Sequence, residues 1–109
     1  MAGNLQELKS ENFKNEVLES KIPVLVDFGA DWCMPCRMIA PSVEELSNDY
    51  AGRVKFAKVD VDNNPELATN FQILSIPALL IFKDGKEIKR IQGALPKEAM
   101  QQEIDGALA

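Results

Sequence analysis

Apolar and polar positions change their spacing several times along the chain, which predicts alternating strands and helices. The run from Ile22 to Gly29 (IPVLVDFG) is mostly apolar and rich in β-branched residues, as in a central strand covered on both faces. Val54 to Val61 alternates enough to form another strand, and Asp84-Gly85 is a two-residue hairpin signal. The pattern therefore predicts strands at residues 4–8, 22–29, 54–61, 77–82 and 87–91.

Two longer segments between these strands have the apolar spacing of amphipathic helices. Ser10 is expected to cap a helix over residues 11–20, and a second helix is expected over residues 33–49. Pro41 lies inside the second helix and is expected to kink it, because proline supplies no N–H and crowds the preceding turn. The predicted buried faces consist of Phe13, Val17 and Leu18 in the first helix and of Met38, Ile39, Val43 and Leu46 in the second.

Two further helices complete the pattern. Asn64-Pro65 is a cap and first-turn signal for a short helix over 65–70, and Pro96 opens a last helix. The apolar side of this last helix is formed by Ala99, Met100, Ile104 and Leu108. Parallel crossovers followed by an antiparallel hairpin predict an α/β fold with a mixed sheet and helices on both faces. We expect one continuous domain over residues 1–109.

Composition narrows the possible functions. The net charge of −5 leaves the chain without the basic footprint of a general nucleic-acid binder. Histidine is absent, which excludes Ser-His-Asp triads, Cys-His dyads and imidazole metal ligands. The N-terminus has no secretory pattern, and the longest nearly apolar run, Ile73 to Phe82, is too short to cross a bilayer. We therefore expect a soluble, cytoplasmic protein with no membrane partner.

The chemistry is concentrated in the sequence Trp32-Cys33-Met34-Pro35-Cys36, directly after the central strand and at the start of a helix. Unpaired N–H groups in the first helical turn stabilise a thiolate at Cys33, and the i, i+3 spacing puts both sulfurs within disulfide range. We expect Cys33 to be the more exposed nucleophile and Cys36 the resolving thiol. A structural disulfide or half of a shared four-cysteine zinc site are the alternatives.

In this strand–turn–helix context, the chain resembles the thioredoxin family. The resemblance is carried by VLVDFGADWCMPCRMIAP, by VDVDNNPELATNFQILSIPALLIFKDG and by the GAL before Pro96. It implies a five-stranded sheet, with strands ordered first, third, second, fourth, fifth, flanked by four helices. It also implies a protein disulfide reductase without metal or cofactor, which acts on disulfide-containing client proteins. A thioredoxin reductase or a ferredoxin-linked counterpart would recharge it, and we expect a monomer.

Further positions match the family pattern. Asp27 lies in an apolar strand, where burial raises the pKa of a carboxyl, and it is expected to accept the proton of Cys36. Lys58 matches the family's buried lysine, and an inert buried ion pair between it and Asp27 is the alternative role. Pro77 matches a cis-proline that faces the cysteines. With Pro77, the apolar rim on which partners dock corresponds to Trp32, Ile76, Gly93 and Ala94, which could instead be simple packing.

The chain departs from the family pattern at three positions. Met34-Pro35 replaces the usual Gly-Pro between the cysteines, so these two residues are expected to tune the redox potential and partner choice. Gly29 stands in place of a tryptophan that packs under the active-site loop, and its absence is expected to loosen that loop. Ala78 replaces a threonine.

Three other classes of function compete with a reductase. An oxidase or isomerase would use the same cysteines at a higher redox potential. A binding module would use the apolar rim without turnover, and a metal carrier would hold zinc or an iron–sulfur cluster on the two thiols.

Overall fold

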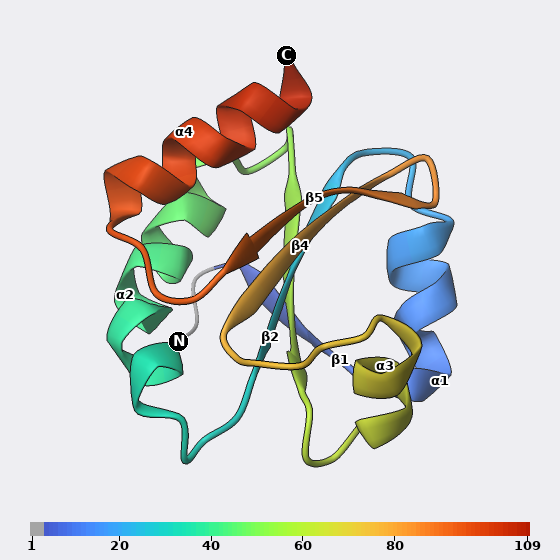
Figure 1. Cartoon of the computed structure of the whole chain (residues 1–109). Helices are drawn as coiled ribbons and strands as arrows, with labels where there is room; N and C mark the ends of the chain where they lie inside the picture. Colours follow the sequence, from blue (N-terminus) through green and yellow to red (C-terminus); the bar gives the residue numbers. More distant parts are fainter. Residues whose placement is uncertain (1–3) are drawn as a thin grey trace.

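The computed structural model describes residues 4–109 and consists of one mixed sheet between two layers of helices (Figure 1). The strands follow the order β1-β3-β2-β4-β5, which confirms the predicted architecture. In chain order the elements are β1 (Leu5–Leu8), α1 (Ser10–Phe13), the π-helical turn η1 (Lys14–Leu18), β2 (Val24–Gly29), α2 (Met34–Asp49), β3 (Lys55–Asp60), α3 (Pro65–Asn70), β4 (Ala78–Lys83), β5 (Lys86–Gln92) and α4 (Lys97–Leu108).

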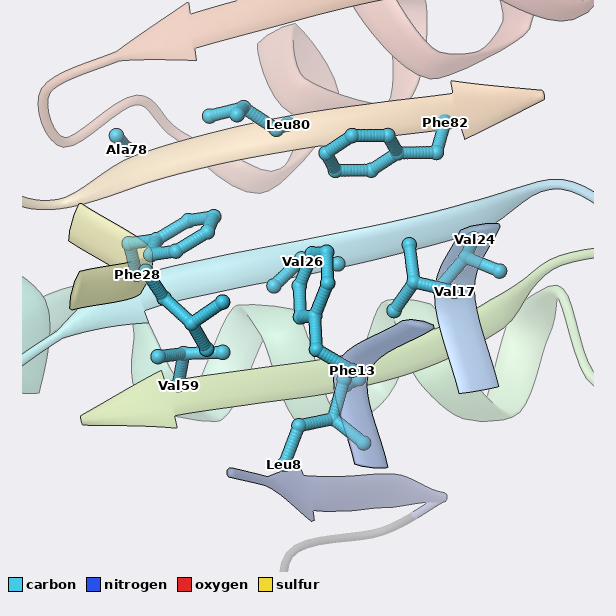
Figure 2. Packing of buried hydrophobic residues seen from close by; sticks show 12 residues of the cluster. Leu8, Phe13, Val17, Val24, Val26, Phe28, Val59, Ala78, Leu80 and Phe82 are labelled. Carbon is cyan, nitrogen blue, oxygen red and sulfur yellow. The ribbon is translucent and has the colours of Figure 1, made fainter. Parts of the chain in front are cut away.

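The central strand β2 pairs in parallel with β3 and antiparallel with β4. Because side chains alternate along a strand, β2 contributes to two separate cores. Val24, Val26 and Phe28 face the layer of α1 and α3, where they pack with Phe13 and Phe82 (Figure 2). Leu25 faces α2 and α4 on the other side, in a cluster with Phe56 and Tyr50.

The same alternation brings polar residues to one end of the α2 face. Leu25, Asp27 and Gly29 occupy successive positions on this face, opposite Phe56, Lys58 and Asp60 of β3. The apolar core under α2 therefore gives way to a carboxyl, a lysine and a glycine at the carboxyl ends of the parallel strands. That edge directly precedes the cysteines, since α2 begins at Met34.

The N-terminal helix differs from its prediction. Helical structure ends at Leu18, and its N-cap is Lys9, whose side chain makes no capping hydrogen bond. The Ser10 amide instead donates to Oδ1 of Asn64, 3.1 Å away, a partner 54 residues distant in the sequence. Asn64 stands at the N-cap of α3 but does not cap that helix with its own side chain. A tertiary contact therefore takes the place of the predicted Ser10 cap, while the Lys9 amide donates locally to Oδ1 of Asn12 over 2.9 Å.

Two apolar residues predicted to be buried are exposed. Met38 is 69% exposed, so the buried stripe of α2 consists of Ile39, Val43 and Leu46 without it. Ile22 lies outside β2, which begins at Val24. In both cases the apolar pattern extends beyond the area that the neighbouring layer covers. The helix α2 continues on both sides of Pro41.

The hairpin prediction is confirmed. Asp84 and Gly85 connect β4 to β5 with φ angles of 54° and 80°, the left-handed conformation that a tight two-residue turn requires. Within residues 4–109, no helix has the length and apolar character needed to cross a membrane.

Candidate active site

Cys33 and Cys36 form a disulfide at the start of α2, with their Cα atoms 5.3 Å apart. Cys33 is the N-cap residue of the helix, and the amide of Cys36 donates a hydrogen bond to Cys33 Sγ over 3.2 Å. Helix N-termini present unpaired N–H groups and a partial positive charge, so this position favours a negative sulfur. The geometry therefore places the disulfide at a helix start, with a backbone N–H directed at the sulfur of its first cysteine.

The exposure of the two cysteines is the reverse of the prediction. Cys33 is only 4% exposed, whereas Cys36 is partly exposed. Cys33 Sγ lies 3.9 Å from the carbonyl oxygen of Ile76, so the loop before β4 covers it. Sequence reasoning placed Cys36 one turn inside the helix, but the loop that covers Cys33 comes from a segment 43 residues further along the chain.

Asp27 carries a strongly perturbed carboxyl. Burial raises the pKa of Asp27 to about 6, and the positive charge of Lys58 partly opposes that rise. Oδ1 of Asp27 is buried and has no hydrogen-bond partner. The expected rise in pKa is therefore present.

The position of Lys58 corrects the expectation of a buried ion pair. Lys58 is exposed, and the ion pairs within 4 Å in residues 4–109 do not include one between Lys58 and Asp27. In the sheet register Lys58 lies between Asp27 on β2 and Glu7 on β1. Lys58 lies near the end of the α2 face, where its ammonium group reaches solvent. A lysine is more stable with its ammonium hydrated than with it buried.

A cavity of about 500 Å³ lies between this end of the sheet and α2. Its wall includes Asp27, Gly29, Cys36 and Lys58. A Cβ atom placed on Gly29 would stand 3.2 Å from Cys36 Sγ and 3.8 Å from Asp27 Oδ1. The glycine therefore leaves open the space between the thiol and the carboxyl.

The predicted rim residues come from three segments of the chain. Trp32 is 69% exposed, and its Nε1 donates a hydrogen bond to Oδ2 of Asp62 over 2.7 Å. The Ile76-Pro77 peptide bond is cis, as expected from the resemblance. The Gly93 amide donates to the carbonyl of Pro77 over 2.9 Å, and Ala94 beside it is exposed. Pro77 itself is buried and Ile76 is partly exposed, so the exposed part of this loop is Leu74 and Ser75.

Sequence reasoning missed several exposed residues around the site. Leu74 is 92% exposed two residues before Ile76. Met38 lies one helical turn beyond Met34, which is 61% exposed, so both methionines share one face of α2. Asp62 anchors Trp32. The signal for Met38 was its i, i+4 spacing from Met34, whereas nothing local in the sequence marks Leu74 as exposed.

Residues 4–109 contain no group of three or more His, Cys, Asp or Glu side chains that could hold a metal ion. The two sulfurs of Cys33 and Cys36 are bonded to each other.

Comparisons with known proteins agree with this arrangement. The model of the family described as Thioredoxin matches residues 4–106. The chain is 53% identical to "Thioredoxin 1" of Synechococcus elongatus, over 85% of this chain and 87% of that protein. It is 53% identical to "Thioredoxin" of Mycobacterium tuberculosis, over 85% of this chain and 80% of that one. It is 48% identical to "Thioredoxin C-2" of Corynebacterium nephridii, over 96% and 97% of the two chains. With a cysteine pair that forms a disulfide at a helix N-terminus, the chain belongs to the thioredoxin family and is a thiol–disulfide oxidoreductase.

Proposed function

We propose that this protein reduces disulfide bonds in other proteins and is recharged by a thioredoxin reductase or a ferredoxin-linked counterpart. The observation that carries the proposal is the Cys33–Cys36 disulfide at the N-terminus of α2, with the Cys36 amide directed at Cys33 Sγ. Such a cysteine is held ready as a thiolate, which is the species that attacks a disulfide. We infer that the protein acts as a monomer of one thioredoxin domain over residues 1–109, in the cytoplasm.

The reaction proceeds in two exchange steps. The Cys33 thiolate attacks one sulfur of a client disulfide; a mixed disulfide forms, and the other client sulfur leaves as a thiolate that takes up a proton. Cys36 then loses its proton and attacks Cys33 Sγ, which releases the second client sulfur as a thiol. The client gains two electrons and two protons, and the Cys33–Cys36 disulfide remains for the reductase to open.

Asp27 is the proposed acceptor of the Cys36 proton. Cys36 Sγ and Asp27 Oδ1 both lie within 4 Å of the point where a Gly29 Cβ would stand, so a solvent molecule there would contact both atoms. A carboxyl with a pKa of about 6 accepts a proton near neutral pH and returns it readily. Lys58, the neighbour of Asp27 in the sheet, favours the ionised form of this acceptor.

Client proteins are proposed to dock on the rim of the site, which consists of Trp32, Ile76, Pro77, Gly93 and Ala94. The backbone of Ile76 lies against Cys33, so an extended client segment that pairs there would bring its disulfide to the nucleophile. Met34 and Pro35, between the cysteines, are proposed to tune the redox potential and the choice of partner.

Reduction of insulin disulfides by the reduced protein, followed by turbidity, tests the proposal. Activity is expected from the parent chain and should be lost in Cys33→Ser. Cys36→Ser should accumulate mixed disulfides with the client, because attack remains while resolution is lost. A purified protein that forms disulfides in reduced clients but does not reduce insulin would contradict the proposal and favour an oxidase.

A further inference from the structure

Arg90 on β5 holds the start of the segment that joins α3 to β4 (Figure 1). Its Nη2 donates to the carbonyl oxygen of Phe71 over 2.7 Å, and its Nη1 donates to that of Gln72 over 3.1 Å. Glu87 fixes the other edge of the guanidinium, since its carboxylate accepts from Nε over 2.7 Å and from Nη2 over 2.8 Å. The guanidinium is planar and its donors are rigidly arranged, so the two carbonyls are held in one position relative to β5.

The two carbonyls lie at the end of α3, where the backbone changes direction. Gln72 has a φ angle of 53°, in the left-handed region that residues other than glycine rarely adopt. Its amide donates to the Thr69 carbonyl over 3.1 Å, and the Ile73 amide donates to the Ala68 carbonyl over 2.8 Å, which is the pattern of a Schellman motif. Glycine ordinarily occupies this left-handed position. The hydrogen bond from Arg90 therefore stabilises a conformation that the glutamine itself does not favour.

The next three residues, 74–76, lead from this turn to the cysteines. Leu74 and Ser75 are exposed, and within residues 4–109 their backbone groups make no hydrogen bond to other backbone groups. The carbonyl oxygen of Ile76 lies 3.9 Å from Cys33 Sγ. The segment thus has free backbone groups beside the nucleophile, but few contacts of its own to keep it there.

The position of this segment depends on attachments at its two ends. On the C-terminal side, the Pro77 carbonyl accepts a hydrogen bond from the Gly93 amide over 2.9 Å. On the N-terminal side, the attachment is the guanidinium of Arg90. A segment that is ordered in advance costs a binding partner less conformational entropy than one that must be ordered on binding.

We propose that Arg90 is a positioning residue for client docking, which holds the carbonyls of Phe71 and Gln72 so that the segment at Ile76 keeps its place beside Cys33. This inference rests on the proposed reductase function, in which an extended client segment pairs with that backbone. Without Arg90, both carbonyls lose a charged donor, and the client has to order the segment as it binds. The thiol chemistry is unaffected, because no hydrogen bond of Arg90 within residues 4–109 involves a cysteine.

The test compares a protein client with a small disulfide. We measure the second-order rate constants of the reduced protein with insulin and with hydroxyethyl disulfide, which is too small to pair along the segment. Arg90→Gln should lower the rate constant for insulin by about threefold to tenfold without slowing the reaction with hydroxyethyl disulfide. A parent-like rate with insulin would overturn the inference. So would equal slowing of both reactions, which would indicate general damage to the site.

Lys89→Gln is the matched control variant. It removes the same charge from the neighbouring position of β5, but Lys89 forms an ion pair with Glu103 of α4, on the other face of the sheet. Both rate constants should keep their parent values in this variant. If Lys89→Gln slowed insulin reduction as much as Arg90→Gln does, the effect would belong to net charge and the positioning role would be wrong.

A second substitution tests the role of the left-handed turn. In Arg90→Gln combined with Gln72→Gly, the glycine adopts the left-handed conformation without support, so about half or more of the lost insulin rate should return. A purely electrostatic role of Arg90 would not respond to a glycine in the turn. Absence of any recovery would therefore contradict the positioning role.

Amide hydrogen exchange provides a measurement that does not depend on a client. In Arg90→Gln, the amides of Gln72 and Ile73 should exchange about tenfold faster, because the turn opens more often. The Val61 amide, which donates to the Gly29 carbonyl, should keep its rate and serves as the internal reference. Unchanged exchange at the turn would overturn the inference.

Arg90→Lys extends both measurements to a milder variant, which can be used if Arg90→Gln proves too unstable. It keeps the charge, but its single nitrogen cannot reproduce the planar arrangement that holds Glu87 and both carbonyls. It should change insulin reduction and exchange at the turn in the same direction as Arg90→Gln, and parent values in both would overturn the inference. If the parent chain itself failed to reduce insulin while exchange rose in the variants, the reductase function would be wrong and the hold of Arg90 on the turn would stand.

Discussion

The buried carboxyl of Asp27 is unfavourable for folding stability, yet it is the proposed proton acceptor of Cys36. It occupies the central strand between Val26 and Phe28, where an ionised carboxyl is costly and its unpartnered Oδ1 receives no hydrogen bond. A protein that needed only a stable sheet would place an apolar residue here. We therefore expect Asp27 to reduce the free energy of unfolding under the conditions in which it supports proton transfer.

Replacing Asp27 by Asn should stabilise the protein in a pH-dependent way. The pKa of Asp27 is raised from 3.8 to about 6, so the folded state holds this proton more tightly than the unfolded chain does. Folding stability from this group is complete below about pH 4 and is lost as the pH rises through 6. The gain from Asp27→Asn should be near zero at pH 4 and reach at most about 3 kcal/mol above pH 7.

Urea unfolding at pH 4 and pH 8 measures this difference. Lys58→Gln is the companion variant, because loss of the positive charge should raise the pKa of Asp27 further and shift the transition to higher pH. A stability difference that stays constant across this pH range would show that Asp27 is not the titrating group.

Trp32 is expected to report the redox state of the site. It is the sole tryptophan in the chain, it precedes Cys33, and its indole is held by Asp62. Disulfides quench indole emission on contact, so reduction of the protein should raise the fluorescence. Emission spectra before and after reduction measure the change, with Cys33→Ser as the control that should show none. A response in the control would assign the change to something other than the disulfide.

At the scale of elements, two glycines have different structural reasons: Gly29 in β2 and Gly85 in the turn after β4. Gly85 has a φ angle of 80°, and a Cβ there would stand 3.1 Å from the carbonyl oxygen of Leu18. Gly29 has an ordinary backbone and borders a cavity. A side chain should therefore be destabilising at Gly85 and accommodated at Gly29.

Gly85→Ala should lower the free energy of unfolding by about 1–2 kcal/mol, because the left-handed conformation strains an alanine and the Leu18 carbonyl crowds it. Gly106→Ala, within α4, should raise it by about 0.5–1 kcal/mol through helix propensity. Equilibrium urea denaturation compares the two variants. If Gly85→Ala proved as stable as the parent, the turn would have to adopt another conformation.

Gly29→Trp should raise the free energy of unfolding by about 1 kcal/mol or more. The indole would fill the cavity with buried aromatic area, and a strand gains rigidity when a glycine is replaced. The opposing effect is the approach of the new Cβ to Cys36 Sγ, which must yield by a few tenths of an ångström. Urea denaturation of the oxidised protein decides between them. A less stable variant would mean that Cys36 cannot move.

For the whole molecule, stability resides in the two cores and little of it in the disulfide. The cysteines are three residues apart, so their bond closes a very short loop and removes little chain entropy, about 2 kcal/mol or less. The two clusters on the faces of the sheet contain no part of this bond. The reduced protein should therefore stay folded, as a carrier that cycles between the two states must.

Calorimetry of the oxidised and reduced forms tests this distribution. We expect one cooperative transition in each form, with the midpoint of the reduced form lower by at most about 10 °C. Cys33→Ser and Cys36→Ser should behave like the reduced form. Loss of the transition on reduction would show that the disulfide is a structural bond.

Apolar periodicity and a few short motifs were sufficient to predict the strands, the Asp84-Gly85 hairpin and the placement of the cysteines at a helix start. These features depend on local rules, such as alternation in strands and left-handed turn residues, so a single stretch of chain contains the information. The family resemblance added the strand order. It also singled out Asp27 and Pro77.

The burial of individual residues and the contacts between segments far apart in the chain were decided by the tertiary structure alone. Cys33 is buried because the loop at Ile76 covers it, and Lys58 is exposed because its register places it near the edge of the α2 face. Ser10 is the first residue of its helix and not its cap, and its amide donates to Asn64, 54 residues further along the chain. Gly29 borders an open cavity because residues of β2, β3 and α2 come together around it. The residues that surround a position in the fold cannot be deduced from the residues next to it in the sequence.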